Sequence, residues 1–520
     1  MSESPEIIAE RSARSFPPAR LPLWLASVAV LWGVAAAAVY WQQGLTLSHY
    51  DAKGHLVVAR RVIDSLTPGW LQLGAVWLPL PHVLNLAPVQ IDAFYRTGAS
   101  GVFISIASMA LLAYHAAWLI LHFTGSRAAA IGAVAVLLTN PNLVYLQSTP
   151  MTEPLLLGLL AFALTATIRA VEAGSWRALL GASAALVLPF LTRYEAWPFL
   201  GALLVAVVAA QWRAGGGVVR GVAVAARLAA LPVVALLWFL VHSKVTVGAW
   251  FVTGGFFVPD PTYQGQVVTV SGAVWWGLRS LGSEMLARTA AAAAVAAAIW
   301  WWRRQLPATA ILCYAWLAVA ALPWYAFFQG HPFRIRYMVP LVVAATMMAA
   351  LAIGRLPRWR ALASIALVLG VWSTTRPFDP GAAMVLEAQW DLPRSLERRA
   401  VTACLPAAGS DDVVMASMGS LAHYMQETAA AGYALRDYLH EGNGDLWLAA
   451  LERPRDYVRW IAIEEVAEGG DMLAHRARKD AGFLEGFTPV CSGGGVTLYG
   501  RSAGQPEPPR ARHSSVRSAR

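Results

Sequence analysis

Residues 21–41 read LPLWLASVAVLWGVAAAAVYW, an apolar run that follows the polar start MSESPEIIAERSARSFPPAR at 1–20. A run of about twenty apolar residues is long enough to span the hydrocarbon core of a bilayer, which is roughly 30 Å thick. A cleavable signal peptide has a shorter apolar core and ends at a small-residue cleavage site. The sequence therefore predicts a retained membrane anchor near the start of the chain.

Composition extends this prediction to most of the chain. The 520 residues are 57% hydrophobic and 13% charged, with a mean hydropathy of +0.51, whereas soluble domains are about 25% charged. These figures exclude an ordinary cytosolic enzyme, a disulfide scaffold and a disordered chain. About ten further spans are predicted, at 97–122, 128–147, 154–171, 178–192, 196–212, 226–242, 284–302, 307–328, 337–354 and 359–376. The fold class is therefore a polytopic α-helical membrane protein with about eleven spans.

Arginines set the predicted orientation. The net charge of +10 is nearly all arginine, because Lys53, Lys244 and Lys479 are the only lysines, and none of them follows a glycine as the Walker A motif requires. The arginines gather at one set of span ends, which by the positive-inside rule places the N-terminus in the cytoplasm. We expect a multi-pass plasma (inner) membrane protein whose partner is the bilayer and not a nucleic acid.

The composition divides the chain into four parts. Residues 1–20 form a cytoplasmic tail, 21–376 a transmembrane unit with a long first external loop at 42–96, 377–501 a small extracytoplasmic α/β domain, and 502–520 a Pro- and Arg-rich tail predicted to be disordered. Cys404 and Cys491 lie in the exported domain, where oxidation is permitted, so they form either a disulfide or two buried thiols.

Ionisable residues beside membrane spans are candidates for function because they are costly in hydrocarbon. SHYDAKGH at 48–55 follows the first span, and in a helix it would place Asp51 and His55 on one face. Asp51 could act as a general base on an acceptor hydroxyl or amine, or simply cap the helix. His49, Asp51 and His55 could also hold a divalent metal ion, although their spacing matches no strong metal motif.

Later in the same loop, WLPLPH at 77–82 is too apolar for a solvated loop and too rich in proline for a span. This predicts a re-entrant or interfacial segment, in which His82 binds a ligand or lies at the interface. A further span opens with Thr152-Glu153-Pro154, and there Glu153 is either functional or a helix cap.

Two arginine-containing segments complete the external face, TRYEAWP at 192–198 and HPFRIRY at 331–337. Arg334 and Arg336 lie on the predicted external side, where the positive-inside rule disfavours arginine. Two arginines at this spacing can bind a phosphate; anchoring to lipid headgroups is the alternative.

Together these positions resemble the GT-C superfamily of polyprenyl-phosphate-sugar-dependent glycosyltransferases. The nearest branch contains dolichyl-phosphate-mannose–protein mannosyltransferases and lipid A aminoarabinose transferases. Their first span is followed by a long external loop that opens with a catalytic acid, matched here by Asp51, and holds a proline-rich segment, matched by residues 77–81. Ala52 departs from the second acid found in many relatives, and Trp77-Leu78 from the lysine that often precedes the paired prolines.

The resemblance implies transfer of a sugar from a polyprenyl-phosphate donor to a protein, lipid or glycan acceptor at the external face, with no certain cofactor. It implies catalytic roles for Asp51 and Glu153. It leaves the donor phosphate to Arg334, Arg336, Arg193 or Lys53, and substrate contacts to His55, His82, Trp77, Tyr194, Glu195 and Tyr337. The alternative is a transporter or lipid-linked sugar flippase without chemistry, which would place its ionisable groups near the bilayer midplane.

Overall fold

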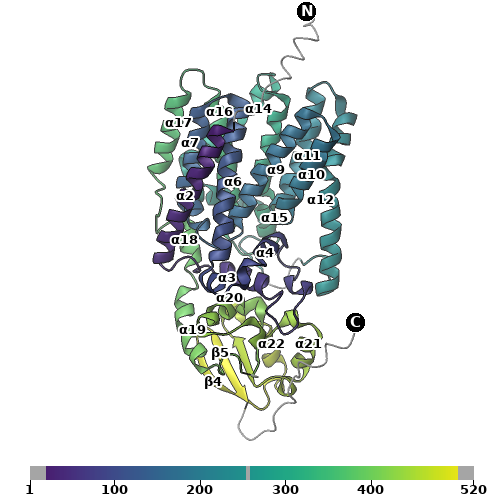
Figure 1. Cartoon of the computed structure of the whole chain (residues 1–520), viewed down its shortest axis with the longest axis vertical. Coiled ribbons are helices and arrows are strands. Elements are labelled where there is room, and N and C mark those ends of the chain that lie inside the picture. Colours follow the sequence, from purple (N-terminus) through teal and green to yellow (C-terminus); the bar gives the residue numbers. More distant parts are fainter. Residues whose placement is uncertain (1–18, 253–257, 411, 502–520) are drawn as a thin grey trace, which may run out of the picture.

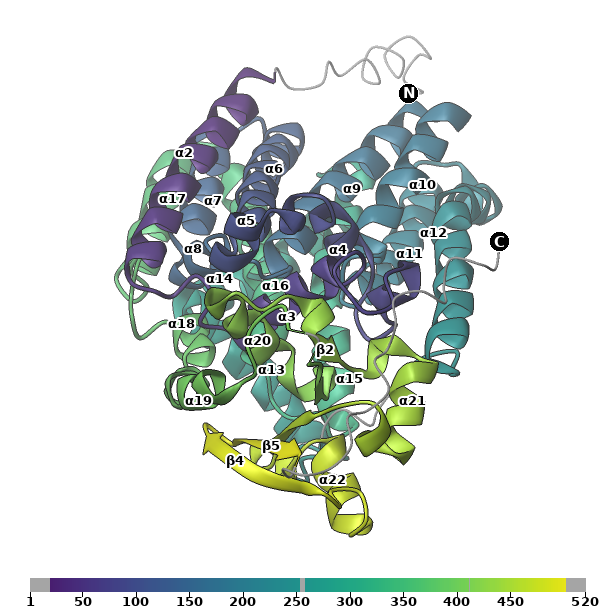
Figure 2. The same ribbon diagram turned by 60° about the horizontal axis from the view of Figure 1, so that its bottom comes forward.

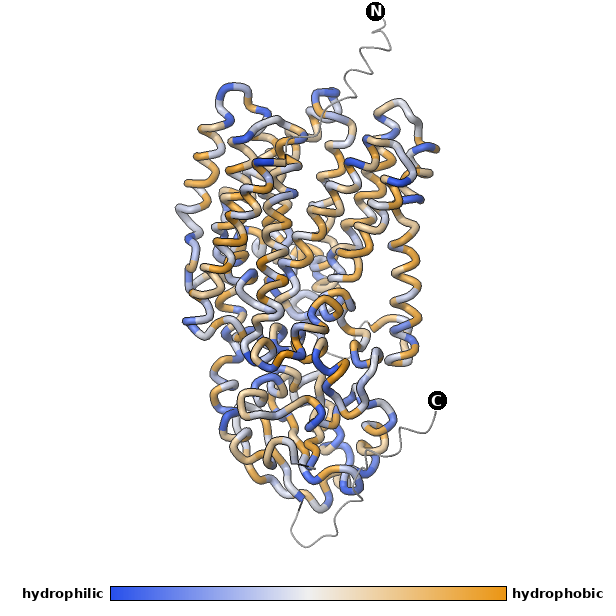
Figure 3. The backbone as a smooth tube through the Cα atoms, in the orientation of Figure 1, coloured by the Kyte–Doolittle hydropathy of each residue, from blue (hydrophilic) through white to orange (hydrophobic). Residues whose placement is uncertain are grey.

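A bundle of long apolar helices forms the first three quarters of the chain (Figures 1 and 3). The structure is a computed structural model that describes residues 19–252, 258–410 and 412–501. Within these residues, eight helical segments are long and apolar enough to cross a membrane. They are α2 (Arg20–Gln42), α6 (Ala99–Thr124), α9 (Glu153–Ala173), α11 (Ala196–Arg213), α12 (Gly217–Val247), α14 (Glu284–Trp302), η3 with α15 (Ala308–Ala320, Ala321–Phe328) and η4 with α16 (Ile335–Met338, Val339–Gly354).

Three predicted spans coincide with shorter apolar helices, so the count of eleven is not confirmed. These are α7 (Arg127–Thr139), α10 (Trp176–Phe190) and α17 (Arg360–Trp372). The predicted span 128–147 is divided because Asn140 caps a separate helix, α8 (Pro141–Leu146), through bonds to the amides of Asn142 and Leu143. Proline is well suited to a first helical turn, and it breaks a helix that it interrupts.

One apolar helix was not predicted, α13 (Val267–Gly282). Its sequence, VVTVSGAVWWGLRSLG, contains three glycines, two serines and an arginine, which lower its apolar signal. It packs closely against η4: a side chain at Gly277 would meet Met338 Cε at 2.6 Å and Cβ at 3.3 Å, so glycine favours the close approach of the two segments.

The first loop, between α2 and α6, is a set of short helices that lie between the bundle and the C-terminal part (Figures 1 and 2). They are α3 (Tyr50–Arg60), η1 (Trp70–Leu73), α4 (Leu80–Asn85), η2 (Pro88–Gln90) and α5 (Asp92–Thr97). Every residue of α3 from Asp51 to Ala59 is buried. The loop therefore forms an ordered layer.

The C-terminal part is a small α/β unit, as predicted. Its five-stranded sheet has the order β2-β1-β3-β5-β4, with β1 parallel to β2 and β3, and β5 antiparallel to β3 and β4. The strands are β1 (Val414–Ala416), β2 (Tyr438–Leu439), β3 (Trp460–Glu464), β4 (Phe487–Gly493) and β5 (Val496–Arg501). The helices are α19 (Leu392–Cys404), α20 (Met418–Thr428), α21 (Asp445–Glu452) and α22 (Met472–Lys479), with short 3₁₀ turns η5 to η9 at Ala429–Ala431, Leu435–Asp437, Glu441–Asn443, Pro454–Asp456 and Ala467–Gly469. The short helix α18 (Ala383–Ala388), which precedes the unit, packs into the core of the bundle.

Two features tie this unit together and to the bundle. Cys404 at the end of α19 forms a disulfide with Cys491 on β4. Leu56 and Val57 of α3 belong to the same apolar cluster as Leu421 and Tyr438 of the α/β unit, so α3 is part of that unit's core. The predicted cytoplasmic and disordered tails at 1–18 and 502–520 lie outside the described residues.

Candidate active site

Helix α3 fixes the position of Asp51. His49 is the residue before the helix, and its Nδ1 accepts a hydrogen bond of 3.1 Å from the amide of Asp51. Asp51 therefore lies in the first helical turn, where a carboxylate is favoured by the helix dipole, and it is only 8% exposed. The other ring nitrogen, Nε2, faces Glu387 Oε1 at 3.6 Å.

Arg336 joins most of the charged groups around Asp51. Its Nη2 lies 2.5 Å from Asp51 Oδ2, its Nη1 3.1 Å from His49 Nε2, and Glu387 Oε1 is 3.7 Å from the same Nη1. Glu387 also accepts a bond of 3.0 Å from the amide of Ile335, the residue before Arg336. Burial favours the neutral form of Glu387, but the bond to His49 and the charge of Arg336 together hold its pKa below the usual value.

A second ion cluster lies beside the first. Arg193 contacts Thr152 Oγ1 at 2.9 Å, Glu153 Oε1 at 3.0 Å and Glu195 Oε1 at 2.8 Å. Burial disfavours the charge on Arg193, yet the charges of Glu153 and Glu195 raise its pKa above the usual value. Arg336 Nε lies 4.0 Å from Glu153 Oε1, so the two clusters are continuous.

Tyr50 and Tyr337 border this charged centre. The Arg336 guanidinium lies 5.8 Å from the Tyr50 ring and 5.5 Å from the Tyr337 ring. Burial, with the charge of Asp51, raises the pKa of Tyr50 to about 12, so its hydroxyl stays protonated at neutral pH. Tyr337 Oη is 3.3 Å from His331 Nε2, which links the site to the loop before η4.

Two histidines of the first loop, His55 and His82, form a separate pair. His55 Nδ1 lies 3.1 Å from His82 Nε2, and the Trp77 ring lies 4.1 Å from that of His55. Burial lowers the pKa of both histidines, to about 3 for His82, so both are neutral at pH 7. Tyr194 Oη donates to the carbonyl of Val76, which holds this part of the loop against the segment that carries Arg193.

Two sets of predicted ligands, Lys53 for the donor phosphate and His49, Asp51 and His55 for a metal ion, have other partners in the structure. Lys53 points into the α/β unit, where Nζ lies 2.6 Å from Glu427 Oε1. His49 contacts Asp51, whereas His55 pairs with His82; among the described residues no group of three or more His, Cys, Asp or Glu side chains is arranged to hold a metal ion.

Arg334 lines a cleft of about 520 Å³ together with Tyr50 and Glu387.

Sequence reasoning missed Glu387. It lies on α18, in the stretch AAMVLEAQW at 382–390, just after the last predicted span. A single acidic residue in an otherwise apolar stretch beside a membrane was the available signal. Glu387 and Asp51 are 336 residues apart in the sequence, so their shared contact with Arg336 could not be expected from it.

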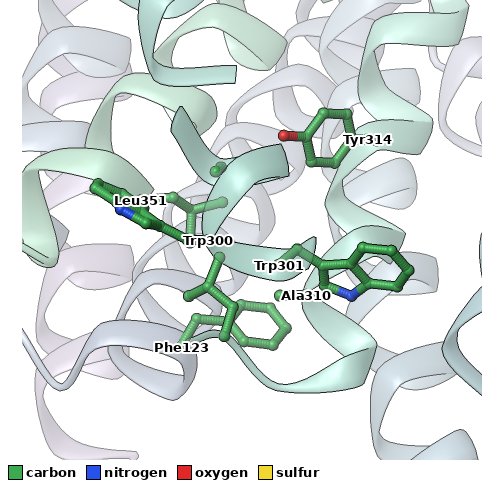
Figure 4. A pocket seen from close by; sticks show the side chains of 8 residues that line it. Phe123, Trp300, Trp301, Ala310, Tyr314 and Leu351 are labelled. Carbon is green, nitrogen blue, oxygen red and sulfur yellow. The ribbon is translucent and has the colours of Figure 1, made fainter. Parts of the chain in front are cut away.

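A small pocket at the other end of the bundle has a different character (Figure 4). Phe123, Trp300, Trp301, Tyr314 and Leu351 are among its lining residues, and its volume is about 10 Å³. This space accommodates at most about one water molecule, so it is a packing defect and not a substrate site.

Comparison with known proteins supports the fold. No family model matches the sequence, and no curated protein sequence matches it. The structure is similar to the apo-state crystal structure of ArnT from Cupriavidus metallidurans, with a TM-score of 0.55 and 13% sequence identity, over 91% of this chain and 98% of that chain. At this identity the similarity shows the fold alone, and at that level it confirms the predicted resemblance.

Proposed function

We propose that the protein is a membrane glycosyltransferase that moves a sugar from a polyprenyl-phosphate donor to an acceptor at the external membrane face. The observation that carries the proposal is the buried Asp51 carboxylate, which the first turn of α3 holds against Arg336 at the junction of the bundle and the α/β unit. A long prenyl chain stays in the bilayer while its phosphate and sugar reach this junction.

The proposed reaction is an inverting substitution at the anomeric carbon. Asp51 accepts the proton of the acceptor hydroxyl or amine, the acceptor atom bonds to the anomeric carbon, and the bond from that carbon to the phosphate oxygen breaks. The leaving phosphate gains negative charge, which a nearby guanidinium stabilises. Glu153 supports the reaction indirectly, because its charge helps to hold Arg193 and Arg336 in place.

The contacts of the four phosphate candidates distinguish them. Lys53 is paired with Glu427, and Arg193 is paired with Glu153 and Glu195. Arg336 lies beside Asp51, and Arg334 lines the open cleft next to it. Closeness to Asp51 therefore favours Arg336, and with it the neighbouring Arg334, for the donor phosphate. His55, His82, Trp77, Tyr194, Glu195 and Tyr337 are then proposed to shape the substrate site around them.

The charged residues also favour an enzyme over the rival transporter. Asp51, Arg193, Arg336 and Glu387 gather at the end of the bundle beside the α/β unit, whereas transporters bind their substrates near the bilayer midplane.

A transfer assay with purified full-length protein and a radiolabelled polyprenyl-phosphate sugar tests the proposal. Asp51→Asn keeps the size of the side chain and removes the base, so we expect transfer to fall by about two orders of magnitude or more. The matched control is Asp445→Asn, because Asp445 is an exposed acid in the first turn of α21. Activity of Asp51→Asn close to that of the control contradicts the proposed mechanism.

A further inference from the structure

Four arginines surround the short turn that follows α14, at the end of the bundle opposite the charged centre. The turn runs from Arg303 to Leu306, and its carbonyls accept hydrogen bonds from Arg213 at the end of α11 and from Arg355 just after α16. Glu195 of the charged centre lies directly before α11, which has 18 residues, so the turn lies about 27 Å away along this helix. The turn is thus separate from the site of the proposed reaction.

Arg304 has an unusual backbone conformation in this turn. Its φ angle is 61°, in the left-handed region that favours glycine and disfavours residues with a side chain. Its amide donates to the carbonyl of Trp301 at 3.1 Å, so Arg304 ends α14 in the way that a glycine usually does. An arginine here costs folding free energy that a glycine would not, which points to a use for its exposed side chain.

Arg213 is held in place by two contacts. Its Nη2 donates to the carbonyl of Leu306 at 3.0 Å, and its guanidinium lies 4.6 Å from the centre of the Trp301 ring. Its Nε and Nη1 are shielded from water and have no acceptor among the described residues. Such donors cost free energy, because their bonds to water are lost and not replaced. The side chain as a whole is half-buried, so an acceptor can approach it from the membrane surface.

The positive charge around the turn is not balanced. None of the four arginines forms an ion pair with a carboxylate in the part of the chain that the structure describes. The charge of Arg304 also acts unfavourably on that of Arg213. One carboxylate, Glu172, comes near, but it accepts a bond of 2.7 Å from Thr309 and lies 3.0 Å from His122. The complement of this turn is therefore an anion.

Aromatic and apolar side chains place the turn at the membrane surface. Trp212 of α11 and Trp302 of α14 are 52% and 72% exposed, and tryptophan prefers the headgroup level of a bilayer. Further along the same helices, Val205 and Val295 are exposed as lipid-facing side chains are. The small pocket of Figure 4, which Leu306 helps to line, has no room for an acyl chain, so acyl chains can lie only on the outer surface.

Topology alone does not explain this arrangement. The positive-inside rule needs arginines on one side of the membrane, and an exposed arginine such as Arg360 at the start of α17 satisfies it. The rule requires neither a left-handed backbone at Arg304 nor the convergence of Arg213 and Arg355 on one turn. Guanidinium groups bind phosphate oxygens through paired hydrogen bonds, and basic pockets between spans bind anionic headgroups.

We propose that this turn binds the phosphate of an anionic phospholipid in the surrounding leaflet. Arg304 and Arg213 bind the phosphate oxygens, Arg303 and Arg355 add positive charge, and the acyl chains lie along the exposed faces of α11 and α14. The bound lipid supplies the negative charge that the described residues lack at this point, and it joins the ends of α11, α14 and α16.

Lipid binding to the full-length protein tests the proposal without any sugar donor. Native mass spectrometry gives the Kd of the first phosphatidylglycerol and of the first phosphatidylcholine that bind. We expect phosphatidylglycerol to bind about tenfold or more tightly, because one charge-assisted hydrogen bond has about this effect. We also expect a higher Tm in nanodiscs that contain phosphatidylglycerol than in nanodiscs of phosphatidylcholine alone, because a ligand of the folded state stabilises it.

Two outcomes of these measurements overturn the proposal. One is equal affinity for the two lipids. The other is an equal rise in Tm when inorganic phosphate is added to phosphatidylcholine nanodiscs at matched ionic strength, because this would identify a soluble phosphate as the ligand.

Two variants and a control locate the site. Arg213→Ala and Arg304→Gly should each weaken phosphatidylglycerol about fivefold and leave phosphatidylcholine unchanged. The Tm of Arg304→Gly in phosphatidylcholine nanodiscs should not fall, because glycine relieves the left-handed backbone. Arg360→Ala is the matched control, because it removes the same charge from an exposed arginine at the start of α17, on the other side of the bundle (Figure 1), and it should change neither property.

The variants also separate a lipid site from a structural role. A lower Tm of Arg304→Gly in phosphatidylcholine nanodiscs with unchanged lipid affinity identifies a structural arginine and overturns the proposal. Equal losses of affinity in all three variants identify a general effect of net charge, and they overturn it as well.

Discussion

Arg336 shows how one buried side chain can organise a charged site. It contacts Asp51, Glu387 and Glu153, which lie on three segments that are distant in the sequence. The sequence indicated that Arg336 and Asp51 lie on one side of the membrane, but sidedness does not determine which charges pair. Pairing depends on side-chain packing between η4, α3 and α18, and no periodicity in the sequence reports it.

Replacement of Arg336 separates its two proposed roles. Arg336→Ala removes the partner of Asp51 and a phosphate contact, so donor use should fall tenfold to a hundredfold, corresponding to about 1.5–3 kcal/mol. Arg336→Lys should recover only part of this loss, because an ammonium group cannot make the planar paired contact. The measurement is kcat/KM for the donor at low donor concentration. Equal activity in the Arg, Lys and Ala forms contradicts a phosphate role.

The His55–His82 pair predicts a pH effect on stability. Burial lowers the pKa of both rings, to about 3 for His82, so the unfolded chain takes up protons below about pH 6.5 that the folded chain does not. Stability is therefore complete above pH 6.5 and falls as the pH drops, by up to about 1.4 kcal/mol per pH unit for each histidine. The Tm of the purified protein between pH 7 and pH 5 measures this. His82→Gln should reduce the slope, and an unchanged slope contradicts the assignment.

Among the elements, α19 and β4 are joined covalently. The Cys404–Cys491 disulfide closes a segment with a sequence separation of 87, which includes most of the sheet. Cysteine location in the predicted exported domain left both a disulfide and two thiols open. The pairing became clear only when the strand order brought β4 against α19.

The disulfide should stabilise the α/β unit. Replacing both cysteines by alanine is expected to cost about 2–5 kcal/mol, which is typical for loss of a native disulfide. Non-reducing peptide mass spectrometry should link Cys404 to Cys491 and leave the buried Cys313 free. Free thiols at both positions, in protein taken from its native membrane, contradict either the pairing or the exported location.

The long apolar helices were the most predictable elements, and the breaks between elements were the least. Apolar length predicts a helix such as α6 because a membrane selects for it directly. The end of α7 depends on the cap that Asn140 provides for α8, and α13 lies close against Met338 at Gly277. These contacts are invisible to a hydropathy window.

In the molecule as a whole, a buried ionic network joins α3 of the first loop to the α/β unit. Glu427 accepts bonds from Lys53 of α3 at 2.6 Å and from Arg398 Nη2 at 2.8 Å, and Arg398 also contacts Asp391. Burial raises the pKa of Glu427, but Arg398 and Lys53 bring it down to about 2, so it stays ionised at neutral pH. The helix that carries Asp51 is thus anchored to the α/β unit two residues further on.

This anchor should matter for activity. Lys53→Met removes the cation and leaves Glu427 to Arg398, so we expect faster amide exchange in α3 and α20 and a lower kcat. Lys53→Arg keeps the charge and should restore both. Hydrogen exchange with mass spectrometry measures the first effect and the transfer assay the second. If Lys53→Met matches the unaltered protein in both, then Lys53 does not position α3.

Orientation in the membrane is also testable at this scale. The arginine bias predicts that the N-terminus is cytoplasmic and the α/β unit is outside. An alkaline phosphatase fusion after residue 501 should be active in cells, and a fusion after residue 214, in the turn between α11 and α12, should be inactive. The reverse pattern contradicts the orientation.

The helices of the bundle differ widely in length. Helix α12 has 31 residues, about 46 Å at 1.5 Å per residue, whereas α7 and α17 have 13 residues each, about 20 Å. They lie on opposite sides of the molecule (Figure 1). A helix longer than the hydrocarbon core tilts or extends beyond it, and a shorter one thins the bilayer locally, so we expect the bilayer to be thinner beside α17 than beside α12. His242 Nε2 of α12 lies 2.9 Å from the carbonyl of Gly74, so we expect a change in membrane thickness to be transmitted through α12 to the loop layer that holds Asp51.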